Sequence, residues 1–576
     1  MTASEPASGP PGDAAPPAAI ASGKRRPSPV LLALLAGSGF LFLLGLHWGL
    51  PSWHGWAGDE ILPRHVGVGL GRWFSGGWHT KYPPFHYYVL ALVQAPLRIL
   101  SRLRWIPAGG SGIYEVYFVL DRLVSVAMAL GAVLAIARVG RTVSGERAGL
   151  FAGALVACGA PFVYFAKTAN VEMPFLFWFA LSLVFYVRLL DEHRLRDYLW
   201  FAVCAVLAIT SKDQAYGLYV LAPLAIVPSL ARARSIEGAR PGRLSWLAAL
   251  GDRRILAVLG LGLVLAAAIY NWPANWRGFL AHVHTLLGPQ SQEAKAFPPT
   301  LLGYLETVGQ NVVHLRFCMG WPGFLAGVAG AGWAAARARG REGRRLASIA
   351  LLGLSYELTF LAPILFSRDR YVLPLALLLA LSGGRLLAAL IEPGRLRTIR
   401  IALVAAVLAY GFLYALSVDL RMIQDGRYAA EEWIRARGVP PGRAVAIGRV
   451  KHAPRLPVVK WHGFERTLAR RRPEVVAVNR IDLRSKSERA AFDRLLSGAL
   501  GYRLAARCQG RSRWDLLDTE GSLSSLIFVD PEIDLFARTG APAGPALGMA
   551  PGTPANDEGG PAGETSDDFD SDEGDE

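Results

Sequence analysis

Four short polar segments of the chain carry ionisable side chains directly beside apolar runs. Their charged residues include Asp59, Glu60, Glu172, Lys212 and Arg370. A carboxylate such as Asp59 can act as a general base that deprotonates a hydroxyl acceptor. Lys212 can bind a phosphate as a point charge, and Arg370 can bind it through a bidentate fork. These residue types predict a reaction in which a phosphate leaves while nearby cations stabilise its developing charge.

The elements that must position these residues are those of a membrane protein. The 576-residue chain is 52% hydrophobic and 18% charged, with a mean hydropathy of +0.30, whereas soluble chains carry about 25% charged residues. The net charge of +16 could indicate nucleic-acid binding. The arginines, however, lie mostly in short loops between apolar runs, where the positive-inside rule explains them. We therefore expect no nucleic-acid partner.

The hydrophobic pattern predicts a polytopic all-α membrane protein with about eleven spanning helices. The run 30–50 follows Lys24-Arg25-Arg26 and is predicted to be a signal anchor whose end lies outside. If the helix at 85–100 lies along the interface instead of spanning, five later Arg-rich loops all fall in the cytoplasm. The remaining predicted spans are 114–137, 148–166, 173–190, 197–211, 214–230, 255–271, 312–336, 346–366, 371–391 and 399–418.

In this topology the four polar segments lie outside the cytoplasm. Because the number of spans is odd, the C-terminal part also lies outside. Short strand patterns near 445–447 and 475–478 indicate a small α/β domain there. The predicted regions are a disordered cytoplasmic tail (1–28), a membrane domain (29–419) with outer loops (51–112 and 272–311), the extracytoplasmic α/β domain (420–540) and a disordered acidic tail (541–576). The predicted location is the cell inner (plasma) membrane, with the site on its periplasmic side.

Any one of these charges is equally consistent with an ordinary solvated turn. Ionisable groups at membrane depth are costly, however, and usually mark a substrate path or a reaction centre. Glu172 and the pair Lys212-Asp213 interrupt tight turns between closely spaced apolar runs. Taken together, the segments therefore favour a reaction centre. Asp121-Arg122, near the second span, is interpreted as a structural ion pair in preference to a support for the first outer loop.

Short motifs around these charges occur in a characteristic order along the chain. They are Gly58-Asp59-Glu60, Lys81-Tyr82-Pro83-Pro84-Phe85-His86-Tyr87, Ala169-Asn170-Val171-Glu172-Met173-Pro174, Thr210-Ser211-Lys212-Asp213 and Arg370-Tyr371-Val372-Leu373-Pro374. In these motifs the sequence resembles the GT-C superfamily of membrane glycosyltransferases over about residues 30–480. Within it, the chain looks like the branch of protein O-mannosyltransferases, the aminoarabinose transferase of lipid A and the transferases of lipopolysaccharide-core galacturonosylation.

The resemblance implies an inverting transfer of a sugar from a polyprenyl-phosphate donor at the extracytoplasmic face. Asp59 and Glu60 would be the catalytic residues, with Asp59 as the base, and Lys212 and Arg370 would bind the donor phosphate. Residues implied to bind or orient the substrates are Lys81, Tyr82, His86 and Glu172. Many relatives carry Asp where this chain has Glu172, which is longer by one methylene. The acceptor is left open among a protein, lipid A or core saccharide, and a cell-envelope glycan.

Other functions and ligands are less consistent with the sequence. A transporter or flippase of a lipid-linked saccharide would also place charges in the membrane, but such proteins often contain internal repeats, and the sequence shows none. A non-catalytic scaffold would not need the acidic pair at Asp59. His282 and His284 could bind a metal, but an i, i+2 pair on a helix points to different faces. We therefore predict no metal site and no cofactor, although a divalent metal remains compatible with the chemistry.

Overall fold

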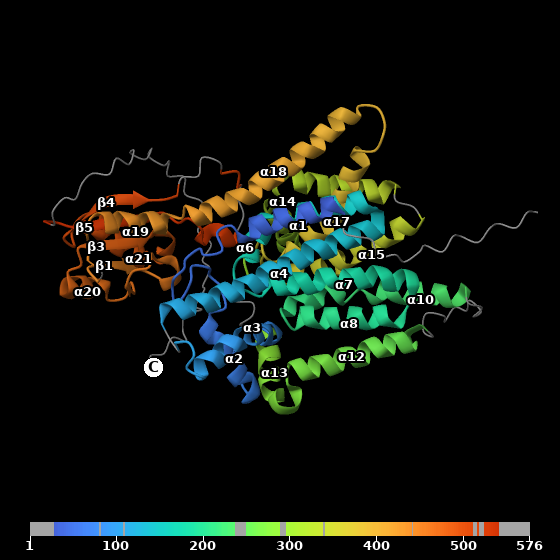
Figure 1. Ribbon diagram of the computed structural model, residues 1–576, viewed down its shortest axis with the longest axis horizontal. Helices are drawn as coiled ribbons and strands as arrows, with labels where there is room; N and C mark the ends of the chain where they lie inside the picture. The colour runs from blue at the N-terminus through green and yellow to red at the C-terminus, as the bar shows by residue number, and fades with distance from the viewer. Residues whose placement is uncertain are drawn as a thin grey trace, which may run out of the picture.

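The computed structural model describes residues 28–79, 82–107, 110–236, 249–287, 295–337, 340–440, 442–510, 515–517 and 524–540. A bundle of helices forms most of the molecule, and a smaller α/β unit lies at one end of it (Figure 1). The bundle and its first loop contain α1 (Pro29–Leu43), α2 (Pro63–Phe74), α3 (Phe85–Arg102), α4 (Ser111–Ser144), α5 (Glu146–Ala157), α6 (Ala160–Ala166), α7 (Glu172–Glu192), α8 (Leu195–Ile209), η1 (Asp213–Ala215), α9 (Tyr216–Tyr219), α10 (Pro223–Ile236), α12 (Arg253–Ile269), α13 (Trp272–Leu287), α14 (Leu301–Arg337), α15 (Gly340–Tyr356), η3 (Glu357–Leu361), α16 (Ala362–Ile364), α17 (Leu373–Leu390) and α18 (Arg397–Ile423).

Within the described residues, seven helices are long and apolar enough to cross a membrane, or up to nine if each of two bent pairs is one span. The chain is thus a multi-pass helical membrane protein, but the predicted number of about eleven spans is not confirmed. Two of the predicted spans coincide with α1 and α8, which have 15 residues each. Fifteen residues rise only about 22 Å, less than the ~30 Å hydrocarbon core.

The two bent pairs have local causes in the sequence. Helices α5 and α6 meet at 72° where Gly159 and Pro161 interrupt the run, because proline lacks the N–H that would continue the helix. Helices α12 and α13 meet at 87°. There Asn271 has a φ of 54°, a left-handed conformation that ends a helix. A run that looks continuous in hydropathy is therefore two helices in each case.

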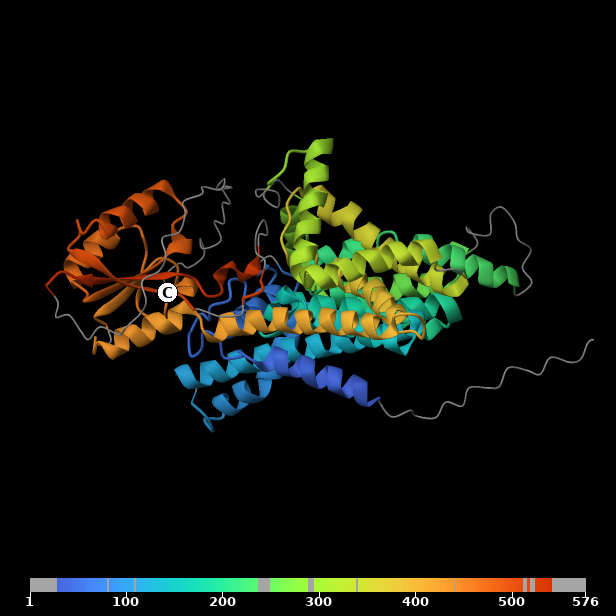
Figure 2. The same ribbon diagram turned by 90° about the horizontal axis from the view of Figure 1, so that it is seen from above.

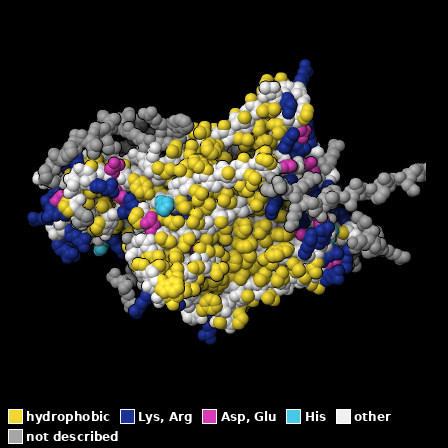
Figure 3. Space-filling view, viewed as in Figure 1, with side chains coloured by type: hydrophobic (Ala, Val, Ile, Leu, Met, Phe, Trp, Pro, Cys, Tyr) yellow, Lys and Arg dark blue, Asp and Glu magenta, His cyan; other side chains and the backbone are white. Residues whose placement is uncertain are grey.

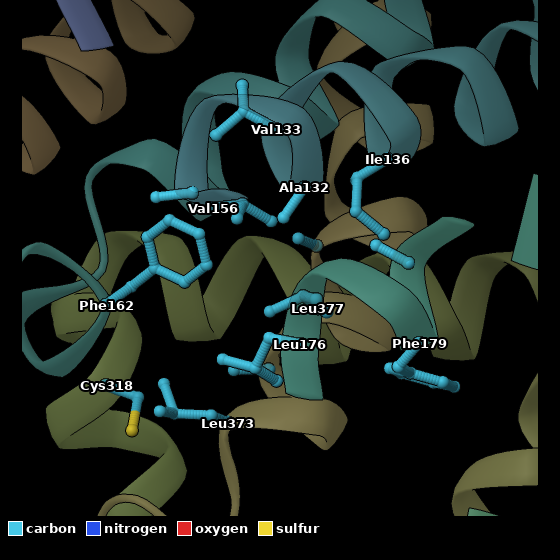
Figure 4. Close-up of a cluster of buried hydrophobic side chains, with 14 of the residues drawn as sticks. Ala132, Val133, Ile136, Val156, Phe162, Leu176, Phe179, Cys318, Leu373 and Leu377 are labelled. Atoms are coloured by element: carbon cyan, nitrogen blue, oxygen red, sulfur yellow. The ribbon is translucent and has the colours of Figure 1, made fainter. Parts of the chain in front are cut away.

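The centre of the bundle is packed through small residues. A Cβ atom on Gly149 of α5 would lie 2.2 Å from the carbonyl oxygen of Ala137 on α4. A Cβ atom on Gly384 of α17 would lie 2.4 Å from the carbonyl oxygen of Ala148 on α5. Such close backbone approach is typical of membrane helices. Around this seam α4, α5, α6, α7, α14 and α17 contribute the buried apolar side chains drawn in Figure 4, which fix the helix ends that carry the site.

The first loop contains two helices where the sequence predicted one. Helix α3 covers the predicted interfacial run, and it buries one face that includes His86 and Tyr87. Helix α2 precedes it and packs on it through Val66 and Trp73. Glycines at alternate positions of α2 conceal its amphipathic pattern, because glycine disfavours helix. The position of both helices relative to the membrane stays a prediction.

The α/β unit begins where α18 ends (Figure 2). Its sheet has the order β2-β1-β3-β5-β4, with β1 parallel to β2 and β3, and β5 antiparallel to β3 and β4. One apolar layer lies between the sheet and α19, and a second lies between the sheet and α20 and α21. The elements are α19 (Gly426–Ala436), β1 (Ala444–Ile447), η4 (Val450–His452), β2 (Val458–Val459), α20 (Phe464–Arg471), β3 (Val475–Asn479), η5 (Arg480–Asp482), α21 (Lys486–Leu496), β4 (Tyr502–Cys508), η6 (Ser525–Phe528) and β5 (Ile533–Arg538).

Candidate active site

The predicted site residues lie at helix ends that meet at one end of the bundle. Asp59 precedes α2, and Glu172 is the first residue of α7. Lys212 has an extended conformation that separates α8 from η1, and Arg370 lies in the turn before α17. Pro374 occupies the first turn of α17, where its missing N–H costs no hydrogen bond. Helix α17 therefore begins at Leu373, shortly after Arg370.

Asp59 and Arg370 form an ion pair at the more exposed side of the site. Oδ2 of Asp59 accepts a hydrogen bond from an Nη atom of Arg370. The Asp59 side chain is 48% exposed, whereas that of Arg370 is only 13% exposed. Asp59 can therefore meet an incoming group from the solvent side while its arginine partner stays sheltered.

A second pair lies deeper, directly behind the first. Nζ of Lys212 donates to Oε1 of Glu172 over 2.7 Å, and both side chains are almost fully buried. The same Oε1 lies 3.9 Å from Nε of Arg370. Within the described residues, Oε2 of Glu172 and Nε of Arg370 are buried and have no hydrogen-bond partner. Unsatisfied buried polar atoms are rare, and here they leave hydrogen-bonding capacity for a ligand.

Tyr371 is a site residue that the sequence reasoning did not single out. Its ring centroid lies 5.6 Å from Nζ of Lys212 and 5.5 Å from the guanidinium carbon of Arg370. Burial acts to raise the pKa of Tyr371, but the positive charges of Arg370, Lys212 and Arg368 outweigh it and lower that pKa. The phenol therefore lies within a positive field that would also attract a phosphate. Its adjacency to Arg370 in the motif was the available signal.

Glu60 differs from its neighbour Asp59 because it is sealed inside the fold. Its two oxygens accept hydrogen bonds from Nε and an Nη of Arg122 over 2.7 and 2.8 Å, and both side chains are fully buried. Oε1 also accepts from the backbone N–H of Ala169 at 2.9 Å. The pairing of Arg122 with Asp121 expected from the sequence is wrong, since Asp121 instead accepts hydrogen bonds from Gln94. Arg122 supports the first loop.

The second motif is only partly described. Lys81 lies outside the described residues. Burial raises the pKa of Tyr82, and the charge of Glu172 adds to that rise. His86 is fully buried, and within the described part of the chain neither ring nitrogen has a hydrogen-bond partner. Burial lowers its pKa to about 3.

The histidine pair of the second outer loop forms no metal site in the described part of the chain. Nε2 of His282 lies 3.1 Å from Oδ2 of Asp213, and its ring stacks on Trp78 at 4.1 Å. His284 is exposed. Among the described residues, no group of three or more His, Cys, Asp or Glu side chains could hold a metal ion. The described side chains thus provide cations and carboxylates, which suit phosphate binding and proton transfer.

Part of the chain matches the model of a known protein family. Residues 102–239, about a quarter of the 576-residue chain, match the model of the dolichyl-phosphate-mannose-protein mannosyltransferase family. The chain is similar to GT-C glycosyltransferases. The resemblance expected from the motifs is thereby confirmed for a segment that includes Glu172 and Lys212. No curated protein matches the chain at a significant level.

The chain is similar to several solved structures at low identity. The oligosaccharyltransferase AglB from Archaeoglobus fulgidus, in complex with an inhibitory peptide and a dolichol-phosphate, is 13% identical with a TM-score of 0.45, over 82% of this chain and 71% of that one. ArnT from Cupriavidus metallidurans bound to undecaprenyl phosphate is 12% identical with a TM-score of 0.44, over 90% and 99%. The S. cerevisiae Pmt1-Pmt2 complex bound to the sugar donor is 16% identical with a TM-score of 0.31, over 52% and 38%.

Proposed function

We propose that this protein is a membrane glycosyltransferase that transfers a sugar from a polyprenyl-phosphate donor to a hydroxyl acceptor. The observation that carries the proposal is the layered site, in which the exposed Asp59 pairs with Arg370 in front of the buried Lys212–Glu172 pair. It combines one accessible carboxylate with two sheltered cations. The match to a mannosyltransferase family over residues 102–239 supports the same reaction class.

In the proposed reaction, the acceptor hydroxyl gives its proton to Asp59 and its oxygen attacks the anomeric carbon of the donor sugar. The bond between that carbon and the phosphate oxygen breaks, and the electron pair leaves with the polyprenyl phosphate. Arg370 and Lys212 stabilise the charge that develops on this phosphate. A donor phosphate competes with Asp59 for Arg370, so donor binding frees the carboxylate to act as the base. Attack opposite the leaving phosphate inverts the anomeric configuration.

The remaining predicted residues take supporting roles in this proposal. Glu60 positions the Asp59 loop through Arg122, since its own oxygens are buried and occupied. Glu172 holds Lys212 and uses its second oxygen to orient the sugar or the acceptor. Tyr82 and His86 are proposed to orient substrate on the basis of their motif. Lys81 is proposed to bind substrate on the basis of its motif alone.

The proposed orientation places the site and the α/β unit on the periplasmic face of the cell inner membrane. Apolar side chains cover the middle of the bundle, and Lys and Arg gather at its ends (Figure 3). At the end away from the α/β unit, Arg341 and Arg345 of α15 pair with Asp191 of α7, so arginine-rich loops meet there, as the positive-inside rule requires of a cytoplasmic end. The acceptor is proposed to be a protein, a lipid A or core saccharide, or another envelope glycan.

The decisive experiment follows the fate of the lipid donor. The purified full chain is incubated with a set of radiolabelled polyprenyl-phosphate sugars and candidate acceptors, and release of polyprenyl phosphate is measured together with labelled product. Transfer with coupled release supports the proposal. Movement of an intact lipid-linked saccharide across vesicles without bond cleavage would instead support a flippase. The orientation is tested separately with a cysteine at the position of His54, which should react with an impermeant thiol reagent from outside.

A further inference from the structure

The α/β unit contacts the polypeptide directly beside Asp59. Nζ of Lys451, in η4, donates a hydrogen bond over 2.7 Å to the carbonyl oxygen of Gly58. On the same loop, a Cβ atom built on Gly58 would lie 3.7 Å from the ring of Phe528. A charge-assisted hydrogen bond and an aromatic ring thus hold the peptide unit that precedes the proposed base.

The same unit also contacts the polypeptide directly beside Arg370. Asp369 is fully buried, and its Oδ2 accepts hydrogen bonds from the N–H of Ser525 at 2.8 Å and from the hydroxyl of Ser524 at 3.2 Å. Its Oδ1 accepts from the hydroxyl of Ser525 at 2.9 Å and from the N–H of Arg370 at 2.7 Å. One carboxylate therefore connects the arginine backbone to the start of η6.

These two contacts belong to one rigid part of the α/β unit. Phe528, at the end of η6, stacks on His452 beside Lys451, with ring centroids 4.6 Å apart. Arg427 donates hydrogen bonds to the carbonyl oxygens of both Phe528 and Lys451, over 2.8 and 3.0 Å. Arg427 is itself fully buried against Asp425. The groups that hold Gly58 and Asp369 are therefore fixed relative to one another.

We infer that the α/β unit is a component of the catalytic centre, in which Lys451 and the Asp369–Ser525 contact are positioning elements that set the separation of Asp59 and Arg370. This inference rests on the proposed function. Asp59 and Arg370 come from distant parts of the chain, and each is anchored by its preceding residue to the same surface. Displacement of a catalytic group by about 1 Å can cost roughly 10²-fold in rate, so an anchor of this kind controls turnover without touching substrate.

The first test removes one anchor at a time from the full-length protein. Lys451→Met should lower kcat for sugar transfer about tenfold or more with little change in donor KM, because Arg370 and Lys212 remain in place. Lys451→Arg keeps a donor for the Gly58 carbonyl and should restore most of the rate. Lys460→Met is the matched control, since Lys460 is an exposed lysine of the same unit, and it should behave as the wild type.

The second test separates the two anchors. Asp369→Asn and Ser525→Ala should raise donor KM about fivefold to tenfold, because they release the backbone of Arg370, the phosphate ligand. If all of these variants kept wild-type kcat and KM and only unfolded at a lower temperature, the contacts would be a passive domain interface and the inference would be overturned. Loss of kcat in Lys451→Met without rescue by Lys451→Arg would also overturn it. Failure of the wild type to transfer any sugar would instead reject the proposed function.

Discussion

Asp59 and Glu60 are adjacent carboxylates that each pair with an arginine, yet their surroundings differ completely. The Glu60 side chain and its partner Arg122 are fully buried, and both carboxylate oxygens are occupied. The Asp59 side chain is 48% exposed, and its partner Arg370 has a buried Nε without a hydrogen-bond partner in the described structure. A satisfied buried pair can only support the fold. An accessible pair with spare hydrogen-bonding capacity can exchange partners with a substrate.

The strongest test of this comparison is Asp59→Asn. The amide keeps the shape of the side chain but cannot accept a proton, so transfer should fall by about 10³-fold, within the range of roughly 10²–10⁴ for general bases. Thermal unfolding should stay unchanged, because the side chain is half exposed. Initial rates at saturating donor and acceptor measure the effect, with Asp493→Asn on the exposed surface of α21 as the control. Wild-type turnover in Asp59→Asn would remove the base assignment.

The buried pair should show the opposite pattern. Arg122→Ala leaves Glu60 buried without its cation and should destabilise the protein by about 3–5 kcal/mol. The expected readouts are a lower unfolding temperature in detergent and lower yield. The double variant Arg122→Met with Glu60→Met should recover part of that stability, because it removes both charges. An Arg122→Ala protein of normal stability would contradict the structural role.

Arg370→Lys tests whether the exposed ion pair supplies a ligand for the donor phosphate. Lysine keeps the charge but loses the fork that binds a phosphate through two hydrogen bonds. Donor KM should therefore rise about tenfold, which corresponds to about 1.4 kcal/mol, with a smaller change in acceptor KM. Donor and acceptor titrations measured separately test this. An equal rise in both constants would indicate that Arg370 orders the whole site instead of binding the donor phosphate.

A third carboxylate, Asp530, extends the comparison to the α/β unit. It accepts hydrogen bonds from the backbone N–H groups of Gly426 and Gly510, and burial raises its pKa from 3.8 to about 7. The folded state therefore binds more protons than the unfolded state between these values, so its contribution to stability falls as the pH rises through this window. Asp530→Asn should flatten this dependence. Unfolding temperatures of the full chain at pH 5 and pH 8 measure the difference.

The residues of the site could be found in the sequence because each lies in a short local motif. Lys212 and Arg370 were assigned from turns between apolar runs, and both lie beside Glu172 in the structure. The partners that distinguish Asp59 from Glu60 could not be found this way. Arg122 lies 62 residues from Glu60 along the chain, and only the packing of α4 against the first loop brings the two together.

The number of spans is not confirmed, for a related reason. Hydropathy reports composition over a window and does not detect where a helix bends. The break at Gly159 divides the predicted span 148–166 into α5 and α6, and α2 carries too many glycines to show a clear pattern. The apolar runs themselves were visible, because burial in lipid constrains every residue of a span. A helix bend depends on one or two residues, such as Gly159 and Pro161, and on the helices that pack around them.

The contact between Asp59 and Arg370 joins residues 311 positions apart, and that between Lys451 and Gly58 joins residues 393 apart. At about 5–20 residues per second of synthesis, Asp59 reaches its final side of the membrane tens of seconds before either partner has been made. During that interval the acidic loop must persist beside the bilayer in an incomplete protein. A truncated nascent chain that ends before the α/β unit would therefore be inserted but inert. Activity should appear only after Ser525, which anchors Asp369, has been synthesised.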